Sequence, residues 1–149
     1  MGRRGAVTVA RTGLVACSAA QMVASTIALR YAVEQGLAVD LPYAGIRRRG
    51  DDVPRDSWYL GTGVSQPLLL MAVQLTATSC LLRRQSTAAA VALTGIGAVM
   101  LNGYVTGGPS RRALTANGWS REVTPLTGAG LLLSAGMTAF GISALRRSH

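Results

Sequence analysis

Residues Ser86 to Thr106 read STAAAVALTGIGAVMLNGYVT, a run that contains no charged side chain. A helix needs about 20 predominantly apolar residues to cross the hydrocarbon core of a bilayer. The segment before it, Gly61 to Leu82, is equally free of charge, and the link Leu82-Arg83-Arg84-Gln85-Ser86 has room only for a tight turn. The sequence therefore predicts two consecutive transmembrane helices joined by a short turn.

Two further apolar runs flank this pair, at Thr12 to Leu29 and at Pro125 to Leu145. We therefore expect an all-α integral membrane protein built as a bundle of four transmembrane helices. No connecting segment is long enough to form a separate soluble core, so residues 1–149 form a single membrane domain. The expected spans are approximately 12–33, 61–82, 86–106 and 125–145, and the expected outer loops are approximately 34–60 and 107–124.

The chain has 149 residues and a formal net charge of +9, and all its basic residues are arginines. The arginines occur in pairs and triplets at the ends of the apolar runs, a pattern typical of side chains that anchor helix ends at lipid headgroups. Nucleic-acid binding is therefore not expected. The abundance of Arg, Ala and Gly indicates a bacterial genome of high GC content, and the predicted location is the cell (inner) membrane, as a multi-pass protein.

The distribution of charge predicts that both termini are cytoplasmic. With the N-terminus inside, all six acidic residues fall in the outer loops. The outer segments also carry arginines, so the orientation depends chiefly on Arg83 and Arg84, which lie in the tight turn and favour the inner side. The inner segments carry Arg3, Arg4, Arg11, Arg83, Arg84, Arg146 and Arg147 and no acid.

Small residues recur along two of the predicted helices. In the first span an alanine stands at every fourth position, and the fourth span repeats the spacing. Lipid gives no hydrophobic drive for helix association, so close contact over small residues is what stabilises such bundles. We expect these faces to be buried, either within the chain or against a second copy. The packing residues are Ala16, Ala20, Ala24, Ala28, Ala135 and Ala139.

Uncharged polar residues also lie inside the predicted spans. Gln21, Gln66, Gln74 and Asn102 can donate and accept hydrogen bonds. They predict hydrogen bonds between helices, or alternatively a small hydrated cavity that binds a ligand. No span has a charge at its middle, which argues against a proton-coupled pump of the usual kind.

The outer segments contain the residues that an enzyme would use. Arg111 and Arg112 follow a flexible glycine pair and are candidates for binding a lipid phosphate. If the protein is an enzyme, its acid–base residues are Glu34, Asp40, Asp56 and Glu122, acting on a lipid or isoprenoid. No cofactor is predicted, and no metal site is expected because the sole histidine is His149.

Aromatic residues near the span ends suit the membrane interface, where amphipathic rings are enriched. The residues concerned are Trp58, Tyr59, Tyr104 and Trp119. Anchoring at the headgroup level accounts for all of them, without a catalytic or binding role.

The sequence contains no recognisable catalytic motif, and its leading interpretation is a helix-packing accessory or assembly protein. Its partners are then the lipid bilayer and either another membrane protein or further copies of itself. One alternative is a membrane enzyme of cyclase, isomerase or hydrolase type acting on a lipid or isoprenoid ligand at the outer face. A second alternative is a small-molecule carrier or channel.

Overall fold

The computed structural model describes residues 3–35, 40–41, 46–47, 66–115 and 118–147. Its helices are α1 (Arg3–Gln35), α3 (Leu68–Arg83), α4 (Thr87–Thr106), α5 (Gly108–Ala113) and α6 (Val123–Arg147). A two-residue strand, β1 (Asp40–Leu41), pairs antiparallel with β2 (Ile46–Arg47). Apart from this short ladder the described chain is helical, which confirms the predicted all-α class.

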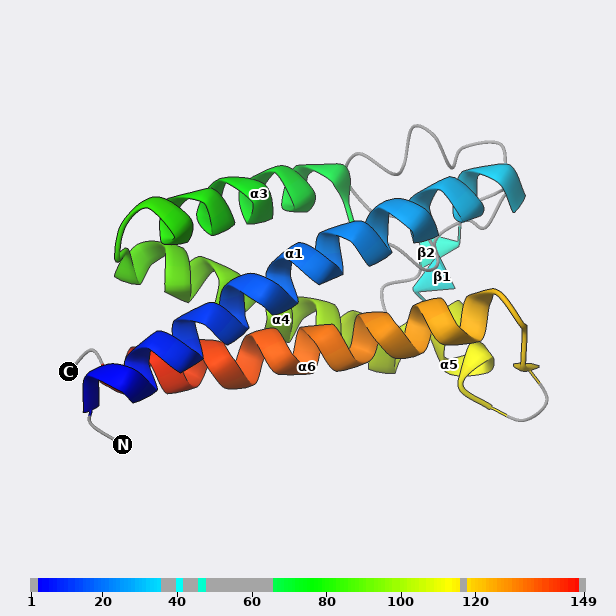
Figure 1. Ribbon diagram of the computed structural model, residues 1–149. Coiled ribbons are helices and arrows are strands. Elements are labelled where there is room, and N and C mark those ends of the chain that lie inside the picture. The colour runs from blue at the N-terminus through cyan, green and yellow to red at the C-terminus, as the bar shows by residue number, and fades with distance from the viewer. Residues whose placement is uncertain (1–2, 36–39, 42–45, 48–65, 116–117, 148–149) are drawn as a thin grey trace.

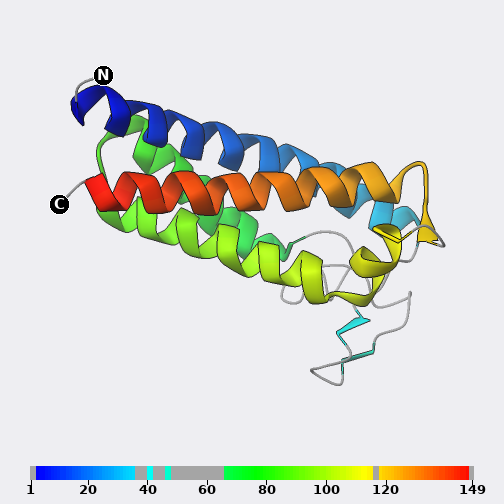
Figure 2. The same ribbon diagram turned by 90° about the horizontal axis from the view of Figure 1, so that it is seen from below.

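The four longer helices run along one another, with α6 between α1 and α4 (Figures 1 and 2). α6 packs extensively on both of these helices, whereas α3 packs less extensively on α1 and α4. α1 begins and α6 ends at the same end of the bundle, beside the turn that joins α3 to α4. We call this the terminal end and the opposite end, which holds α5 and the start of α6, the loop end.

Within the described ranges, three helices are long and apolar enough to cross a membrane: α1 from Gly5, α4, and α6 as far as Arg146. These are the properties of a membrane protein. α3 is apolar but has only 16 residues, which correspond to about 24 Å at about 1.5 Å per residue, less than the roughly 30 Å of a bilayer core. Residues 61–65 of the predicted second span lie outside the described residues. The fourth crossing and the sides of the membrane on which the termini lie therefore stay predictions.

The helix starts follow local chemistry. Ser86 caps α4, because its side-chain oxygen accepts a hydrogen bond from the Ala89 N–H at 3.2 Å. The predicted outer loop 107–124 is partly helical, since it contains α5 and the first two residues of α6. α5 is held to α6 by Thr124, whose hydroxyl donates to the Ala113 carbonyl at 2.9 Å and accepts from the Ser120 N–H at 3.0 Å.

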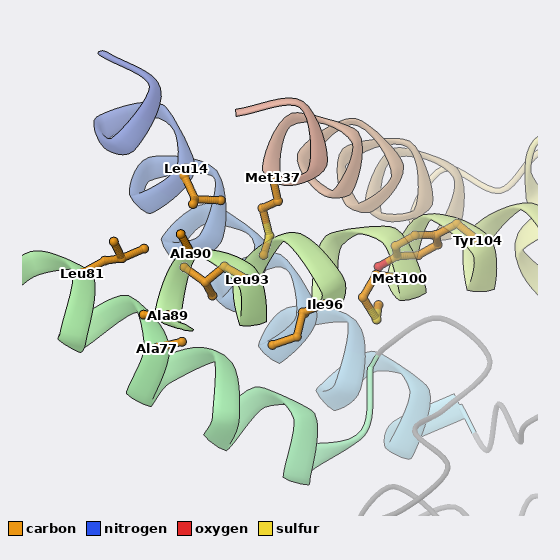
Figure 3. Close-up of a cluster of buried hydrophobic side chains, with 10 residues drawn as sticks. All are labelled: Leu14, Ala77, Leu81, Ala89, Ala90, Leu93, Ile96, Met100, Tyr104 and Met137. Carbon is orange, nitrogen blue, oxygen red and sulfur yellow. The ribbon is translucent and has the colours of Figure 1, made fainter. Parts of the chain in front are cut away.

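The apolar core lies where α1, α3, α4 and α6 meet (Figure 3). Leu14 of α1, Leu93 of α4 and Met137 of α6 are fully buried at its centre. The other members of this cluster are Ala77, Leu81, Ala89, Ala90, Ile96, Met100 and Tyr104. Because the cluster draws on all four long helices, it joins α3 and α4 to the longer pair α1 and α6.

Two glycines allow α4 and α6 to approach closely. A Cβ atom at Gly97 would lie 2.9 Å from the Met137 Cβ, and a Cβ at Gly130 would collide with the Tyr104 hydroxyl. A side chain at Gly97 would push the two backbones apart, and one at Gly130 would displace the Tyr104 ring. The close contact of α4 with α6 therefore depends on the absence of side chains there.

The predicted alanine ladder of α1 is only partly buried. Ala28 and Ala32 pack against Val123 and Leu126 of α6. Ala24 is half-buried, and Ala16 and Ala20 are exposed. A fourth-residue repeat turns by about 40° per step around a helix of 3.6 residues per turn, so it cannot stay on one face. The buried residues of α1 recur instead three or four positions apart and so share one face. They are Ala10, Leu14, Ser18, Gln21, Ser25, Ala28 and Ala32.

On α6 the corresponding alanines are not core residues either. Ala135 is half-buried and Ala139 is exposed. The prediction that these faces are buried within the chain is therefore not met at Ala16, Ala20 and Ala139. Their packing against a second protein stays a prediction.

We predict that Gly97→Leu lowers the stability of the bundle by about 1–3 kcal/mol, because the side chain would overpack the α4–α6 contact. Gly103→Leu is the matched control on the same helix, because a Cβ at Gly103 meets no atom within 4 Å. Thermal unfolding of both variants in detergent, followed by circular dichroism, measures the difference. Equal melting temperatures would contradict the close α4–α6 contact at Gly97.

Candidate functional site

Polar side chains from all four long helices and from the residues that lead into α3 are buried inside the bundle. On α1 they recur three or four residues apart and so share one face, and on α3 Gln74 and Thr78 are one turn apart. We call this set the polar core. It consists of Ser18, Gln21, Ser25, Gln66, Gln74, Thr78, Tyr104, Thr127 and Ser134.

Gln74 is the most connected member of the polar core. Its Nε2 donates to the Ser18 carbonyl at 3.0 Å and to the Ser18 hydroxyl at 3.1 Å. Its Oε1 accepts from Gln66 Nε2 at 2.9 Å. The Ser18 hydroxyl also pairs with the Thr78 hydroxyl at 2.7 Å. These bonds tie α3 to α1.

A second polar link joins α1 to α4. Gln21 Nε2 donates to the Tyr104 hydroxyl at 3.4 Å, and both side chains are buried. Gly130 of α6 makes space for the Tyr104 ring. The structure thus corrects the prediction that Tyr104 is an interfacial anchor, because its ring points into the bundle (Figure 3). Trp119 is exposed, and Trp58 and Tyr59 lie outside the described residues.

Four polar atoms of this core have no hydrogen-bond partner within the described part of the chain: Gln21 Oε1, Ser25 Oγ, Gln66 Oε1 and Thr127 Oγ1. A buried polar group without a partner costs about 1–3 kcal/mol. Ordered water, or a small molecule with hydrogen-bond donors, would satisfy these atoms.

The helix pairing brings two of these atoms to a similar depth. α1 and α6 are antiparallel with Cys17 beside Gly136 and Tyr31 bonded to Glu122, so Thr127 lies near the level of Ser25. The Gln66 amide bonds to Gln74, which itself bonds to Ser18, so it lies nearer the level of Ser18. The unpartnered atoms are therefore spread along the polar core.

The described carboxylates do not form an enclosed acid–base site. Glu34 is exposed and lies 3.9 Å from Arg30 on the same helix. Glu122 is exposed and accepts a hydrogen bond from the Tyr31 hydroxyl at 3.1 Å. Asp40 belongs to β1, but its side chain is outside the described residues, as is all of Asp56.

The remaining predicted binding residues lie apart from the polar core. Arg111 and Arg112 are exposed on α5, and Asn102 is exposed on α4. The structure therefore brings together Gln21, Gln66 and Gln74 and leaves the other three on the surface.

Sequence reasoning missed several residues of the polar core. Thr127 and Ser134 are seven residues apart, two helical turns, so their shared face was recognisable from spacing. Tyr104 was not recognisable in this way, because its burial depends on Gly130 of another helix.

Neither a family model, nor a curated protein, nor a solved structure matches this chain. The function must therefore be inferred from the chain's own geometry. The bundle has a hydrogen-bonded polar interior. The described carboxylates, Glu34 and Glu122, lie on the surface instead.

We predict that Gln74→Leu lowers stability by about 1–3 kcal/mol, because it removes the bonds to Ser18 and leaves Gln66 without its acceptor. Thr76→Val is the control on the same helix, since Thr76 is exposed and bonds only to the Ala72 carbonyl. Denaturant unfolding in detergent compares the two variants. A Gln74→Leu protein as stable as the wild type would show that these bonds contribute nothing.

Proposed function

We propose that this chain is a multi-pass protein of the cell membrane that crosses the bilayer four times, with both termini in the cytoplasm. We further propose that it acts as an assembly protein, through lateral association of its helices with another membrane protein or a second copy. The outward face of α4 carries this proposal.

Small residues and valines share that face. Ala88, Gly95 and Ala98 are exposed on it beside Val91 and Val99, and the space beside Gly95 is open. The exposed apolar residues of α4 are no larger than valine, whereas α3 and α6 also expose larger ones: Leu69, Leu75, Leu82, Leu132, Phe140 and Ile142. Small residues allow a second helix backbone to approach closely, which is the main source of helix association in lipid.

Asn102 lies on the same face of α4, seven residues after Gly95. Its side chain is exposed, and within the described part of the chain it makes no hydrogen bond, although its carbonyl accepts one from Thr106. An amide that faces lipid is unfavourable, and a hydrogen bond from a second helix would satisfy it. An open space at Gly95 that is followed two turns later by an exposed amide suits a helix partner better than lipid tails.

α1 offers a second surface of the same kind, because Ala16, Ala19 and Ala20 are all exposed. This surface of α1 has no exposed amide that would need a hydrogen-bond partner. We therefore take α4 as the primary face and α1 as the secondary one.

The alternatives have less support. Glu34 and Glu122, the described carboxylates proposed for an enzyme, are exposed and paired with neighbours. A carrier would use the polar core, and the four unpartnered atoms favour this function over catalysis. Most of the core, however, bonds to itself.

The charge distribution supports the proposed topology. Arg83, Arg84 and Arg146 are exposed at the terminal end, and the sequence places no acid in the segments that meet there. Arginines in a short turn favour the cytoplasmic side.

We predict that Gly95→Leu and Asn102→Leu each shift the protein toward the monomer, or release its partner, by about tenfold or more, since each loses packing or a hydrogen bond at the interface. Native mass spectrometry of protein extracted gently from its own membranes measures the assembly. Ala20→Leu tests the secondary face in the same way.

Leu132→Phe, at an exposed bulky position of α6, is the control and should leave assembly unchanged. A wild-type protein that is monomeric and free of any partner would overturn the assembly function. A monomer that retains one discrete small molecule would favour the carrier instead.

We predict that a membrane-impermeant maleimide labels Arg121→Cys from outside intact cells but not Gln85→Cys, because the two exposed positions lie at opposite ends of the bundle. Both variants are made in a chain in which Cys17 and Cys80 are alanine. The reverse labelling pattern would show that the topology is the opposite of the proposed one. Labelling of both variants would disprove a cytoplasmic location for the turn between α3 and α4.

A further inference from the structure

A cleft opens at the terminal end of the bundle on either side of Arg11. Two adjoining hollows share Val7, Arg11, Leu81 and Gln85 in their linings. The larger, of about 350 Å³, opens between α1 and α3. The smaller reaches inward toward Leu14, Ala90 and Leu145.

Arg11 is partly buried in this cleft and is held in place by α3. Its Nη2 donates to the Leu81 carbonyl, which belongs to the last turn of α3. A guanidinium carries five N–H donors, and this is the single acceptor that Arg11 has among the described residues. The guanidinium therefore has donors left for an anion that enters the cleft.

The charges around the cleft favour an anion as well. Exposed arginines adjoin the residues that line the cleft: Arg83 and Arg84 stand where α3 ends, and Arg146 follows Leu145. The sequence has no acid between Met1 and Val33 or between Ser57 and Arg121. No carboxylate of α1 before Glu34, of α3 or of α4 thus competes for Arg11.

The walls of the larger hollow combine apolar and polar side chains. Val7, Val15, Leu81 and Leu82 line it beside Arg11 and Gln85, and Thr8 and Thr12 add hydroxyls on the α1 side. Such a lining suits a molecule that has both an apolar chain and a polar group. Arg11 lies at the level of the last turn of α3, just before the arginine pair, which is the depth of a headgroup.

We propose that this cleft binds an anionic phospholipid of the leaflet at the terminal end, with its phosphate on Arg11 and an acyl chain along Val15 and Leu82. The site rests on α1 and α3 crossing the membrane as proposed above, but not on the assembly function. Guanidinium groups bind phosphate through paired hydrogen bonds, which is the chemistry that distinguishes this site from a merely apolar groove.

Native mass spectrometry of the purified full chain tests the site, with phosphatidylglycerol and zwitterionic phosphatidylcholine as probes. The wild type is expected to retain phosphatidylglycerol preferentially. Arg11→Gln should reduce that preference about tenfold, because a charge-assisted bond is lost while a donor for Leu81 remains. Arg11→Lys keeps the charge and should keep most of the preference.

Arg84→Gln is the matched control, since it makes the same change of charge at an exposed position of the same end. An equal loss of preference in Arg84→Gln, or none in Arg11→Gln, would overturn the site in favour of general surface charge. Displacement of the lipid by equimolar glycerol 3-phosphate would overturn the lipid assignment, because a soluble phosphate would then suffice.

Two further variants separate this proposal from folding and from assembly. Val15→Trp fills the groove without changing any charge and should release the lipid even if Arg11→Gln does not fold. Retention of the lipid by Val15→Trp would overturn the assignment. Gly95→Leu should lose assembly yet keep the lipid, so failure of one proposal is distinguishable from failure of the other.

Discussion

The hydrogen bonds of the Gln74 amide are the interaction on which the arrangement of the bundle depends. In an apolar surrounding an amide must be paired within the protein, and Gln74 achieves this by bonding to the backbone and the hydroxyl of Ser18 and to Gln66. These acceptors and donors are available only if α3 lies in one register against α1. α3 is the shortest of the four long helices and has the least packing. The polar contacts of Gln74 therefore fix its position.

The other three long helices are joined by a different interaction, close packing on α6. Gly97 and Gly130 let α4 approach it, and Ala28 and Ala32 let α1 approach it. Close packing positions backbones but specifies register weakly, because lipid solvates apolar side chains as well as a neighbouring helix does. The polar core adds register where packing alone leaves it open, and the Gln21 to Tyr104 bond extends it across the bundle to α4.

The sequence predicted the helices well and their buried faces less well. Absence of charge and the position of Arg83 and Arg84 were enough to place α3 and α4 and the turn between them. The alanine ladder of α1 is buried only in part within the chain, because an every-fourth repeat winds around the helix, so Ala16 and Ala20 are exposed while Ala28 is buried. The spacing of the amides did not predict the bond between Gln66 and Gln74. The burial of Tyr104 and the cleft at Arg11 depend on contacts with other helices, which spacing along one helix does not encode.

Gln74 and Asn102 show why exposure, rather than residue type, points to function in such a chain. Both are amides within apolar helices, but Gln74 is fully buried and bonded, which is sufficient reason for its presence. Asn102 faces outward two turns after Gly95, where neither packing nor bonding within the described chain accounts for it. Arg11 stands between these cases, because it is partly buried and bonded to one carbonyl while its other donors face a cleft. Asn102 and Arg11 each have hydrogen-bonding groups that the described chain leaves unused. Such groups are where a partner or a ligand would bind.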